Sequence, residues 1–220
     1  PIGNLNDLSY RALNILKNVS LIACEDTRQT KKIMSKFKFK NNVTSFNKNN
    51  SLKKIPSIIN YLNSNMSVAL VSDAGMPSIC DPGENLIKQA KSEGINIICI
   101  PGPSAVITAL VSSGFPSSEF TFYGFVPKKK SEREKLFLEI SYSTKTTILF
   151  ESPHRLKKSL FELKNFCGGL REIQVSRELT KKFEENIGNN INKVIEFFEN
   201  KEVLGEITIV IKGKKNTNQT

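Results

Sequence analysis

Three segments rich in glycine, proline and aspartate contain the residues best suited to hold a small ligand. Residues 1–4 read PIGN, residues 73–77 read DAGMP and residues 101–105 read PGPSA. Glycine and alanine let the backbone approach a ligand closely, and proline fixes the loop. Asp73 is suited to accept hydrogen bonds from ribose hydroxyls or an amine, and a helix starting near Pro103 would offer backbone N–H groups to an anion. Each segment alone also fits a structural turn, but three together favour a small-molecule cleft.

Charge forms the second chemical signal. The net charge is +11, and residues 28–54 contain nine lysines or arginines and no acid, so the basicity is local. An acid-free run of this kind indicates a surface that meets a polyanion such as RNA, with a merely solvated face as the alternative. A second basic cluster comprises Lys128, Lys129, Lys130 and Arg133.

Alternating strand and helix patterns must position these residues. Short, nearly continuous apolar runs are typical of strands buried on both faces of a parallel sheet, whose carboxyl ends form ligand sites. We predict strands at 20–24, 42–46, 68–72, 96–100, 120–125, 147–150, 172–176 and 207–211. Helices are predicted after an Asp7 cap, at 27–37, 51–62, 84–92, from Pro103, and at 131–140, 153–166 and 191–198.

The fold class is therefore α/β with two lobes: an N-terminal, largely parallel sheet with helices on both faces and a C-terminal mixed α/β lobe. The turn-forming residues Gly114, Pro116 and Ser117 predict that the boundary between the two lobes lies there. The lobes are residues 1–116 and 117–213, followed by a polar, frayed tail at 214–220.

Several classes are disfavoured by composition. Four separated cysteines and a single histidine, His154, provide no zinc-ligand pattern, so we expect free thiols and no metal. The most apolar stretch, residues 94–115, is interrupted by Pro101-Gly102-Pro103, which argues against a membrane span. With no signal peptide visible, a cytoplasmic location and no membrane partner are expected.

Eight motifs in order give a specific resemblance: PIGN, EDTR (25–28), VSDAGMP (71–77), DPG (81–83), PGPSA, GFVP (124–127), ESPHR (151–155) and RELTK (177–181). Together they resemble the bacterial small-subunit ribosomal RNA cytidine 2′-O-methyltransferases of the tetrapyrrole-methylase class. The resemblance implies S-adenosylmethionine as methyl donor, bound in a cleft between two lobes, and a homodimer. It also implies a cytidine of the ribosomal decoding region as target, in naked RNA or in the assembled subunit.

Motif positions carry the family's donor site onto this chain. The implied donor-binding residues are Gly3, Asp73, Ala74, Gly75, Met76, Gly102, Pro103, Ser104, Ala105, Phe150 and Ile207, with Glu178 also near the adenosyl group. The chain departs from the family at Met76 (usually Thr), Gln29 (usually His) and Phe183 (commonly His or Tyr). The family also has a strand before its PIGN loop, and its absence from this sequence predicts an exposed sheet edge.

Methylation of a 2′-hydroxyl requires in-line positioning and a group that accepts or offsets the proton. We expect a functional set of Glu25, Asp26, Arg28, Glu178 and Lys181, without dividing the roles. Asp26 has the alternative role of capping the basic helix. Lys181 would act as a base if desolvation lowered its pKa, and otherwise would bind a phosphate. His154, at an expected helix start that favours neutral imidazole, is a further candidate base, with a structural or RNA-contacting role as the favoured alternative. The expected RNA contacts are Arg28, Lys31, Lys32, Lys36, Lys128, Lys129, Arg133, Arg155 and Lys182.

Two other functions remain as alternatives. One is a transferase of the same class acting on a porphyrin, a corrinoid or a protein side chain. The other is a non-catalytic RNA-binding relative, which would bind RNA without affinity for the donor.

Overall fold

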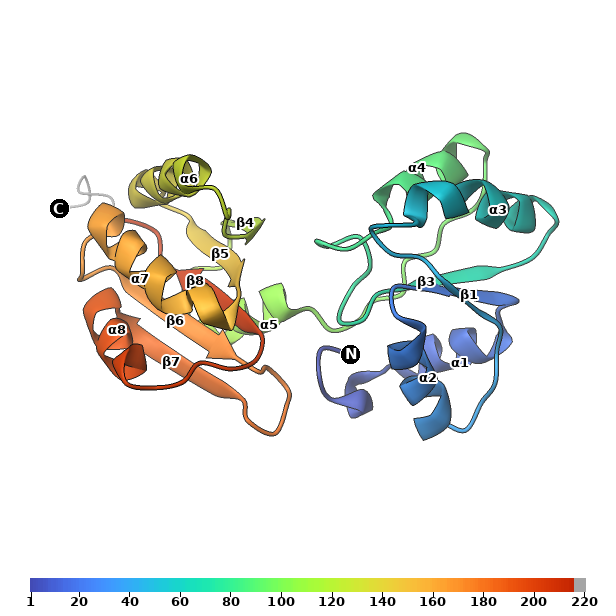
Figure 1. Cartoon of the computed structure of the whole chain (residues 1–220), viewed down its shortest axis with the longest axis horizontal. Helices are drawn as coiled ribbons and strands as arrows, with labels where there is room; N and C mark the ends of the chain where they lie inside the picture. Colours follow the sequence, from blue (N-terminus) through green and yellow to red (C-terminus); the bar gives the residue numbers. More distant parts are fainter. Residues whose placement is uncertain (216–220) are drawn as a thin grey trace. The chain divides into compact units, whose positions relative to one another are not determined.

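A three-stranded parallel sheet organises the first part of the chain. The computed structural model describes residues 1–215 and divides the chain into two units, Pro1–Ser104 and Ala105–Thr220 (Figure 1). In the first unit the strand order is β2-β1-β3, and β1 pairs in parallel with both neighbours. Cys24 at the end of β1 pairs with Ser45 and Val71, so all three strands end at the same edge. The strands are β1 (Leu21–Cys24), β2 (Val43–Ser45) and β3 (Val68–Val71).

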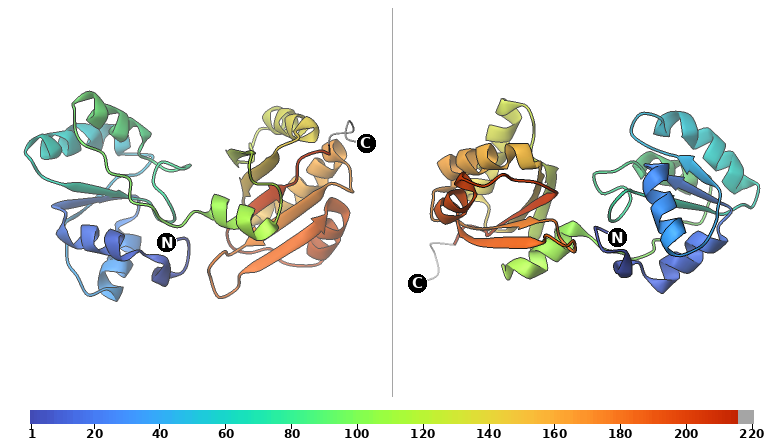
Figure 2. Two further views of the ribbon diagram at one scale, coloured as in Figure 1. Left: turned by 180° about the vertical axis from the view of Figure 1, so that it is seen from behind. Right: turned by 60° about the horizontal axis from the view of Figure 1, so that its bottom comes forward.

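Helices cover both faces of this sheet, as predicted. On one face Ile22 and Cys24 pack with Leu16, and on the other Ala23 packs with Ile55 and other apolar residues of α3 and α4. Figures 1 and 2 show these helices on opposite sides of β1 and β3. The helical elements are η1 (Leu5–Asp7), α1 (Tyr10–Asn18), α2 (Thr27–Lys36), α3 (Ser51–Asn63) and α4 (Glu84–Ser92).

Two local predictions for this unit are wrong. Ser9, not Asp7, caps α1: its hydroxyl accepts a hydrogen bond from the Ala12 N–H at 3.1 Å, and Asp7 ends η1 instead. Residues 96–100 form no strand in the described structure, and Ile98 is 63% exposed. A strand requires a neighbour to complete its hydrogen bonds, and β3, at the edge of the sheet, pairs only with β1.

The second unit contains a five-stranded mixed sheet with the order β4-β5-β8-β6-β7. Only β4 and β5 pair in parallel. One cluster of buried residues joins α6, α7 and α8 to this sheet, including Phe137, Leu160 and Val194. The strands are β4 (Phe120–Phe125), β5 (Thr146–Glu151), β6 (Glu172–Arg177), β7 (Glu185–Asn190) and β8 (Ile207–Ile211). The helices are α5 (Ala105–Ser113), α6 (Lys130–Tyr142), α7 (Pro153–Cys167) and α8 (Ile191–Glu199).

The boundary lies earlier than the predicted position at Pro116. Helix α5 belongs to the second unit because it packs on β8, and the Gln174 amide of β6 donates a hydrogen bond to the Ser112 hydroxyl at 2.9 Å. Val106, Ala109 and Leu110 of this helix are buried. Gly114 and Pro116 therefore mark a turn within a unit, whereas Pro103 precedes the true division.

Strand β7 was missed by the sequence analysis. Its sequence, ENIGNN, is polar and has low β-propensity, yet it pairs antiparallel with β6 along its whole length. As an edge strand it leaves alternate residues exposed, which polar side chains tolerate. The tail predicted at 214–220 lies outside the described residues from 216 onward.

Candidate functional site

The three ligand-holding segments predicted from the sequence meet in the first unit. The Gly75 N–H donates a hydrogen bond to the Pro1 carbonyl at 3.0 Å. A Cβ atom added to Gly75 would lie 3.4 Å from Ile2 Cγ2 and 3.5 Å from the Pro103 carbonyl oxygen. One added to Gly102 would lie 3.5 Å from the sulfur of Met76. Gly75 also has a φ of +78°, so the turn favours glycine on conformational grounds as well as space.

Asp73 stands at the centre of this arrangement, just after β3. It is exposed, and its Oδ1 accepts a hydrogen bond from the Asp26 N–H at 2.9 Å, which joins the loops after β1 and β3. The Ser72 hydroxyl lies 3.3 Å from the Ala74 carbonyl and 3.2 Å from that of Gly75, so it fixes the loop beyond Asp73. The structure therefore presents an exposed carboxylate on a loop whose backbone is held in place.

Asp26 acts as the cap of α2. Its Oδ1 accepts from the Arg28 N–H at 2.8 Å, and its Oδ2 lies 2.7 Å from an Arg28 guanidinium nitrogen. The hydrogen bond from the Arg28 side chain holds the pKa of Asp26 below its usual value. Asp26 is thus an ionised capping residue, while the Arg28 side chain remains 86% exposed and able to meet a phosphate.

Asp81 is a residue of this site that the sequence analysis did not single out. Burial raises its pKa to about 6, and the negative charge of Glu25 adds to this, with a smaller contribution from Asp73. Its only sequence signal was the DPG motif at 81–83. A carboxyl group with a pKa near neutrality is well suited to exchange a proton, which makes Asp81 and Glu25 the acid–base candidates of the first unit.

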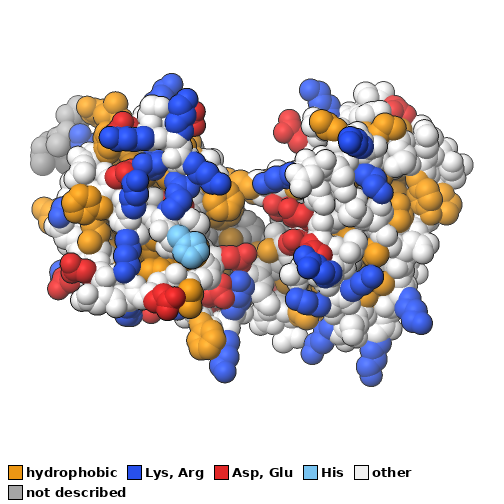
Figure 3. Space-filling view, in the orientation of Figure 1, with side chains coloured by type: hydrophobic (Ala, Val, Ile, Leu, Met, Phe, Trp, Pro, Cys, Tyr) orange, Lys and Arg blue, Asp and Glu red, His pale blue; other side chains and the backbone are white. Residues whose placement is uncertain are grey.

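The basic helix α2 directly follows the loop after β1 that contains Glu25 and Asp26. Its cations Lys31, Lys32 and Lys36 are all exposed, and the helix contains no acidic residue. Figure 3 shows Lys and Arg side chains spread over the part of the first unit that includes α2. The predicted polyanion-binding face is therefore accessible in the structure.

In the second unit, Phe150 lies at the end of β5 beside two other aromatic rings. Its ring centroid is 4.9 Å from that of Phe122 and 5.4 Å from that of Phe125, which is 58% exposed. Ile207, on the neighbouring strand β8, is only 3% exposed and belongs to the hydrophobic core. The Ile207 side chain therefore serves packing, whereas Phe150 belongs to a cluster of three aromatic rings.

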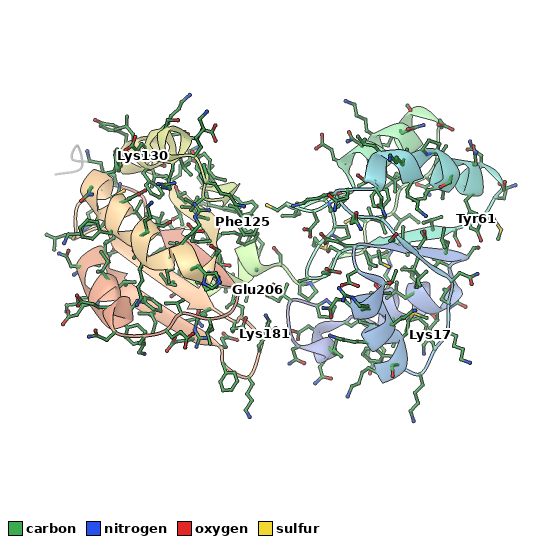
Figure 4. The ribbon with its side chains drawn as sticks, in the orientation of Figure 1. Lys17, Tyr61, Phe125, Lys130, Lys181 and Glu206 are labelled. Carbon is green, nitrogen blue, oxygen red and sulfur yellow. The ribbon has the colours of Figure 1, made fainter. Side chains whose placement is uncertain are left out.

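Glu178 and Lys181 bind each other. The Glu178 Oε1 lies 2.8 Å from the Lys181 ammonium and accepts from the Glu206 N–H at 2.9 Å, and Lys181 also contacts the Glu206 carboxylate at 2.8 Å (Figure 4). Burial lowers the pKa of Lys181, but its hydrogen bonds to Glu178 and Glu206 outweigh this and raise it. Lys181 is therefore a protonated ammonium, which contradicts the possibility that it acts as a base.

The same contacts keep Glu178 ionised. Burial raises its pKa, but the hydrogen bonds from Lys181 and the Glu206 N–H outweigh this and lower it. Glu178 has a φ of +53°, and a Cβ on Gly205 would overlap its side chain. This packing indicates that Glu178 and Lys181 hold the loop after β6 in position.

Two arginines that were predicted to contact RNA instead hold the loop that contains Lys128 and Lys129. Arg133 is 4% exposed, pairs with Glu162, and donates to the carbonyls of Pro127 and Lys128 at 3.2 and 3.0 Å. Arg155 donates to the carbonyls of Val126 and Pro127 at 3.0 and 2.8 Å. Their predicted direct contact with RNA is thus replaced by a positioning role, whereas Lys128, Lys129, Lys182 and His154 are exposed.

The residues of the first unit fit an S-adenosylmethionine-type donor. Gly75 and Gly102 let the three loops pack closely, and exposed Asp73 supplies acceptors for hydroxyl or amino groups. Across residues 1–215, no group of three or more His, Cys, Asp or Glu residues is arranged to hold a metal ion, and no helix is long and apolar enough to cross a membrane.

Comparison with known proteins places this fold and site in a class. The chain belongs to the Tetrapyrrole (Corrin/Porphyrin) Methylases, whose family model matches residues 1–194. Two curated relatives carry the name ribosomal RNA small subunit methyltransferase I. That from Thermotoga maritima is 43% identical and covers 98% of this chain and 96% of its own length. That from Bacillus subtilis is 41% identical and covers 98% of this chain and 74% of its own length.

Solved structures agree at the level of the fold. The methyltransferase CobJ has a TM-score of 0.70 at 15% identity, covering 96% of this chain and 90% of its own. Diphthine synthase has a TM-score of 0.71 at 14% identity, covering 96% and 86%. The predicted two-lobed α/β class is therefore confirmed.

Proposed function

We propose that this chain is an S-adenosylmethionine-dependent methyltransferase that modifies small-subunit ribosomal RNA at the 2′-hydroxyl of a cytidine. The observation that carries the proposal is the junction of the three donor-type loops beside exposed Asp73, whose carboxylate is hydrogen-bonded to the Asp26 N–H at the start of the acid-free helix α2. A ligand loop and a polyanion surface thus follow one another in the same unit. The names of the curated relatives support the same substrate.

The donor, when bound, supplies an electrophilic methyl group. The residues of this chain bind and orient it: Asp73 accepts hydrogen bonds from its polar groups, and the backbone of Gly75, Gly102 and Pro103 shapes the surface against which it lies. The second-unit residue Phe150 offers an aromatic contact. The predicted location of the donor between the two lobes stays a prediction.

Proton transfer from the 2′-hydroxyl falls to a carboxylate of the first unit. Asp81, with its pKa of about 6, is ionised in most molecules at neutral pH, yet basic enough to share a proton. Glu25 is its electrostatic neighbour. Asp26 is committed to the cap of α2 and Lys181 is protonated, so neither takes this role.

RNA binding uses exposed cations of both units. The α2 lysines neutralise phosphates and supply affinity that does not depend on base sequence. Lys128 and Lys129, on the loop held by Arg133 and Arg155, act in the same way. The exposed Lys182 is the third such position, because it sits on the loop between β6 and β7.

Two further expectations come from the resemblance. We expect a homodimer, which light scattering after gel filtration would detect. We also expect the protein in the cytoplasm, where its ribosomal substrate is assembled.

A transfer assay tests the proposal. The purified chain is incubated with methyl-labelled donor and either small-subunit ribosomal RNA, assembled small subunits or uroporphyrinogen, and labelled RNA is digested to nucleosides for mass spectrometry. We expect 2′-O-methylcytidine from one of the two ribosomal substrates. Label in uroporphyrinogen alone would support the tetrapyrrole alternative. RNA binding without heat in a donor titration would support the non-catalytic one.

A further inference from the structure

A surface hollow of the second unit has no part in the donor site described above. It has a volume of about 480 Å³ and is lined by residues that include Arg177, Phe183, Lys201, Glu202 and Leu204. This volume falls within the range of small-molecule sites, roughly 300–1,000 Å³. The lining residues come from the adjoining ends of β6 and β7, from the loop between them, which Figure 1 shows extending beyond the sheet, and from α8 and the segment between α8 and β8. We call it the hairpin hollow.

Two large apolar side chains of the hairpin hollow are exposed to water. Phe183 is 66% exposed and Leu204 is 55% exposed. The ammonium of Lys182 lies 5.5 Å from the centroid of the Phe183 ring. A phenyl ring beside a cation on an extended loop is suited to stack on an unpaired base while the cation meets the adjoining phosphate.

The polar wall of the hairpin hollow is held rigid. Arg177 contacts the Glu185 carboxylate at 3.2 Å and donates to the Leu204 carbonyl at 3.2 Å. Lys201 lies 3.6 Å from the other Glu185 oxygen and 3.4 Å from the centroid of the Phe197 ring. Because these groups are fixed by one another, they provide a preformed surface.

The charged residues that line the hairpin hollow indicate which ligand groups it binds. Three carboxylates, of Glu178, Glu185 and Glu202, line the hollow against the two cations of Arg177 and Lys201. This balance disfavours a phosphate inside the hollow. Carboxylate oxygens accept hydrogen bonds from exocyclic amino groups of bases, as in the pairing of Glu or Asp with cytosine N4. Glu202 is exposed, whereas Glu185 is engaged by both cations, so Glu202 is the available acceptor.

We infer that the hairpin hollow binds an unpaired, amino-bearing nucleobase of the RNA substrate, stacked on Phe183 with its amino group toward Glu202. The inference rests on the proposed function, because it takes RNA as the substrate. It adds a base-reading subsite to the phosphate contacts of the lysines. The hollow prefers cytosine or adenine over uracil, which has no exocyclic amino group.

The chain contains no tryptophan, so Phe183→Trp introduces a single fluorescent reporter that preserves the stacking surface. Short unstructured oligonucleotides of cytidine, adenosine or uridine are titrated into this variant. We expect saturable quenching of the tryptophan, with uridine requiring about tenfold more oligonucleotide. Combining Phe183→Trp with Glu202→Ala removes this preference.

A binding measurement supplies the second readout. Phe183→Ala weakens binding of small-subunit ribosomal RNA about tenfold, measured by anisotropy, with no change in the salt dependence because stacking releases no counterions. The matched control is Phe161→Ala, which removes another exposed ring, 58% exposed, from α7 and leaves affinity unchanged. Thermal unfolding of each variant reports whether it is folded.

Three results would overturn the inference. One is tryptophan emission that does not change while anisotropy reports bound RNA, and another is wild-type affinity of Phe183→Ala. The third is absence of any RNA binding. The proposed function is judged separately by methyl transfer in the wild-type chain: quenching without transfer keeps the hollow as a base site and removes the proposed reaction.

Discussion

The two units use their charged motif residues in opposite ways. In the first unit, Asp73 and the lysines of α2 stay exposed, where a ligand reaches them. In the second unit, Arg133 is buried against Glu162, and Glu178 is bound to Lys181. Motif charges that look alike in the sequence thus remain available for ligand binding at Asp73 and α2 but serve internal structure at Arg133 and Glu178. The difference predicts that substitution of Asp73 or the α2 lysines changes binding, whereas substitution of Arg133 changes stability.

The largest effect is expected at Arg133. Arg133→Ala removes the main partner of the Glu162 carboxylate and the donor to the Lys128 carbonyl, and lowers the free energy of unfolding by about 3 kcal/mol. Urea denaturation measures it. The control Lys129→Ala, whose side chain is 71% exposed, changes stability by less than about 0.5 kcal/mol. Equal effects of the two substitutions would mean that Arg133 is not a structural residue.

Donor binding provides the next test. Asp73→Ala removes the exposed acceptor and weakens S-adenosylmethionine binding about 30-fold, or about 2 kcal/mol, while RNA affinity stays near the wild-type value. Isothermal calorimetry and RNA anisotropy measure the two affinities. Asp7→Ala, another exposed acid of the first unit, is the matched control. Wild-type donor affinity in Asp73→Ala would remove this residue from the site.

A smaller change is expected for the basic helix. Lys31→Ala combined with Lys32→Ala lowers the slope of log affinity against log salt by about 1.8 and weakens RNA binding about tenfold at moderate salt. The paired control is Lys88→Ala with Lys91→Ala, which removes two exposed lysines from α4. Equal slopes in both double variants would place the RNA away from α2.

The smallest effect concerns Asp81 and pH. Its folded-state pKa of about 6 lies above the usual value of 3.8, so the native state binds more protons than the unfolded state between these values. Stability therefore falls as pH rises through this window. Asp81→Asn cannot ionise, so it avoids this loss of stability. Its free energy of unfolding is about 1 kcal/mol higher than that of the wild type at about pH 7.5, after allowance for solvent screening.

The same measurement contains its own control. At about pH 2.5, well below both pKa values, the carboxyl is protonated in both states, so the advantage of Asp81→Asn should disappear. Urea midpoints across the pH range report the difference. An advantage that stays constant with pH would show that Asp81 has no raised pKa.

Much of the fold follows from local pattern. The apolar runs at 20–24, 42–46 and 68–72 became the three parallel strands, and Asp26 proved to be the cap of α2. Apolar content alone predicted a strand at residues 96–100, and this prediction is wrong. Ile98 is exposed, and within the described residues this segment pairs with no strand. Strand β7 was missed for the converse reason, since its partner β6 rather than its own composition holds it in the sheet.

The candidate site residues also divide into those whose properties follow from local sequence and those whose properties depend on distant partners. The proximity of the loops that contain Asp73, Gly75 and Gly102 could be predicted because three such segments together favour one cleft, although each alone also fits a turn. The importance of Asp81 could not, because its raised pKa depends on burial and on Glu25, which is distant in sequence. The structural roles of Arg133 and Arg155 were likewise hidden, because Glu162 is distant in sequence from Arg133, as are the Val126 and Pro127 carbonyls from Arg155.

The sequence by itself determined which chemical groups the chain offers: the small residues and the carboxylate of the three loops, the excess of cations, and the family to which the order of the motifs belongs. Those properties reside in residue type and spacing. Tertiary structure alone decided which charges remain available to a ligand, since that depends on desolvation and on partners supplied by other elements. Lys31 and Arg133 are both cations within basic clusters, yet only Lys31 remains exposed.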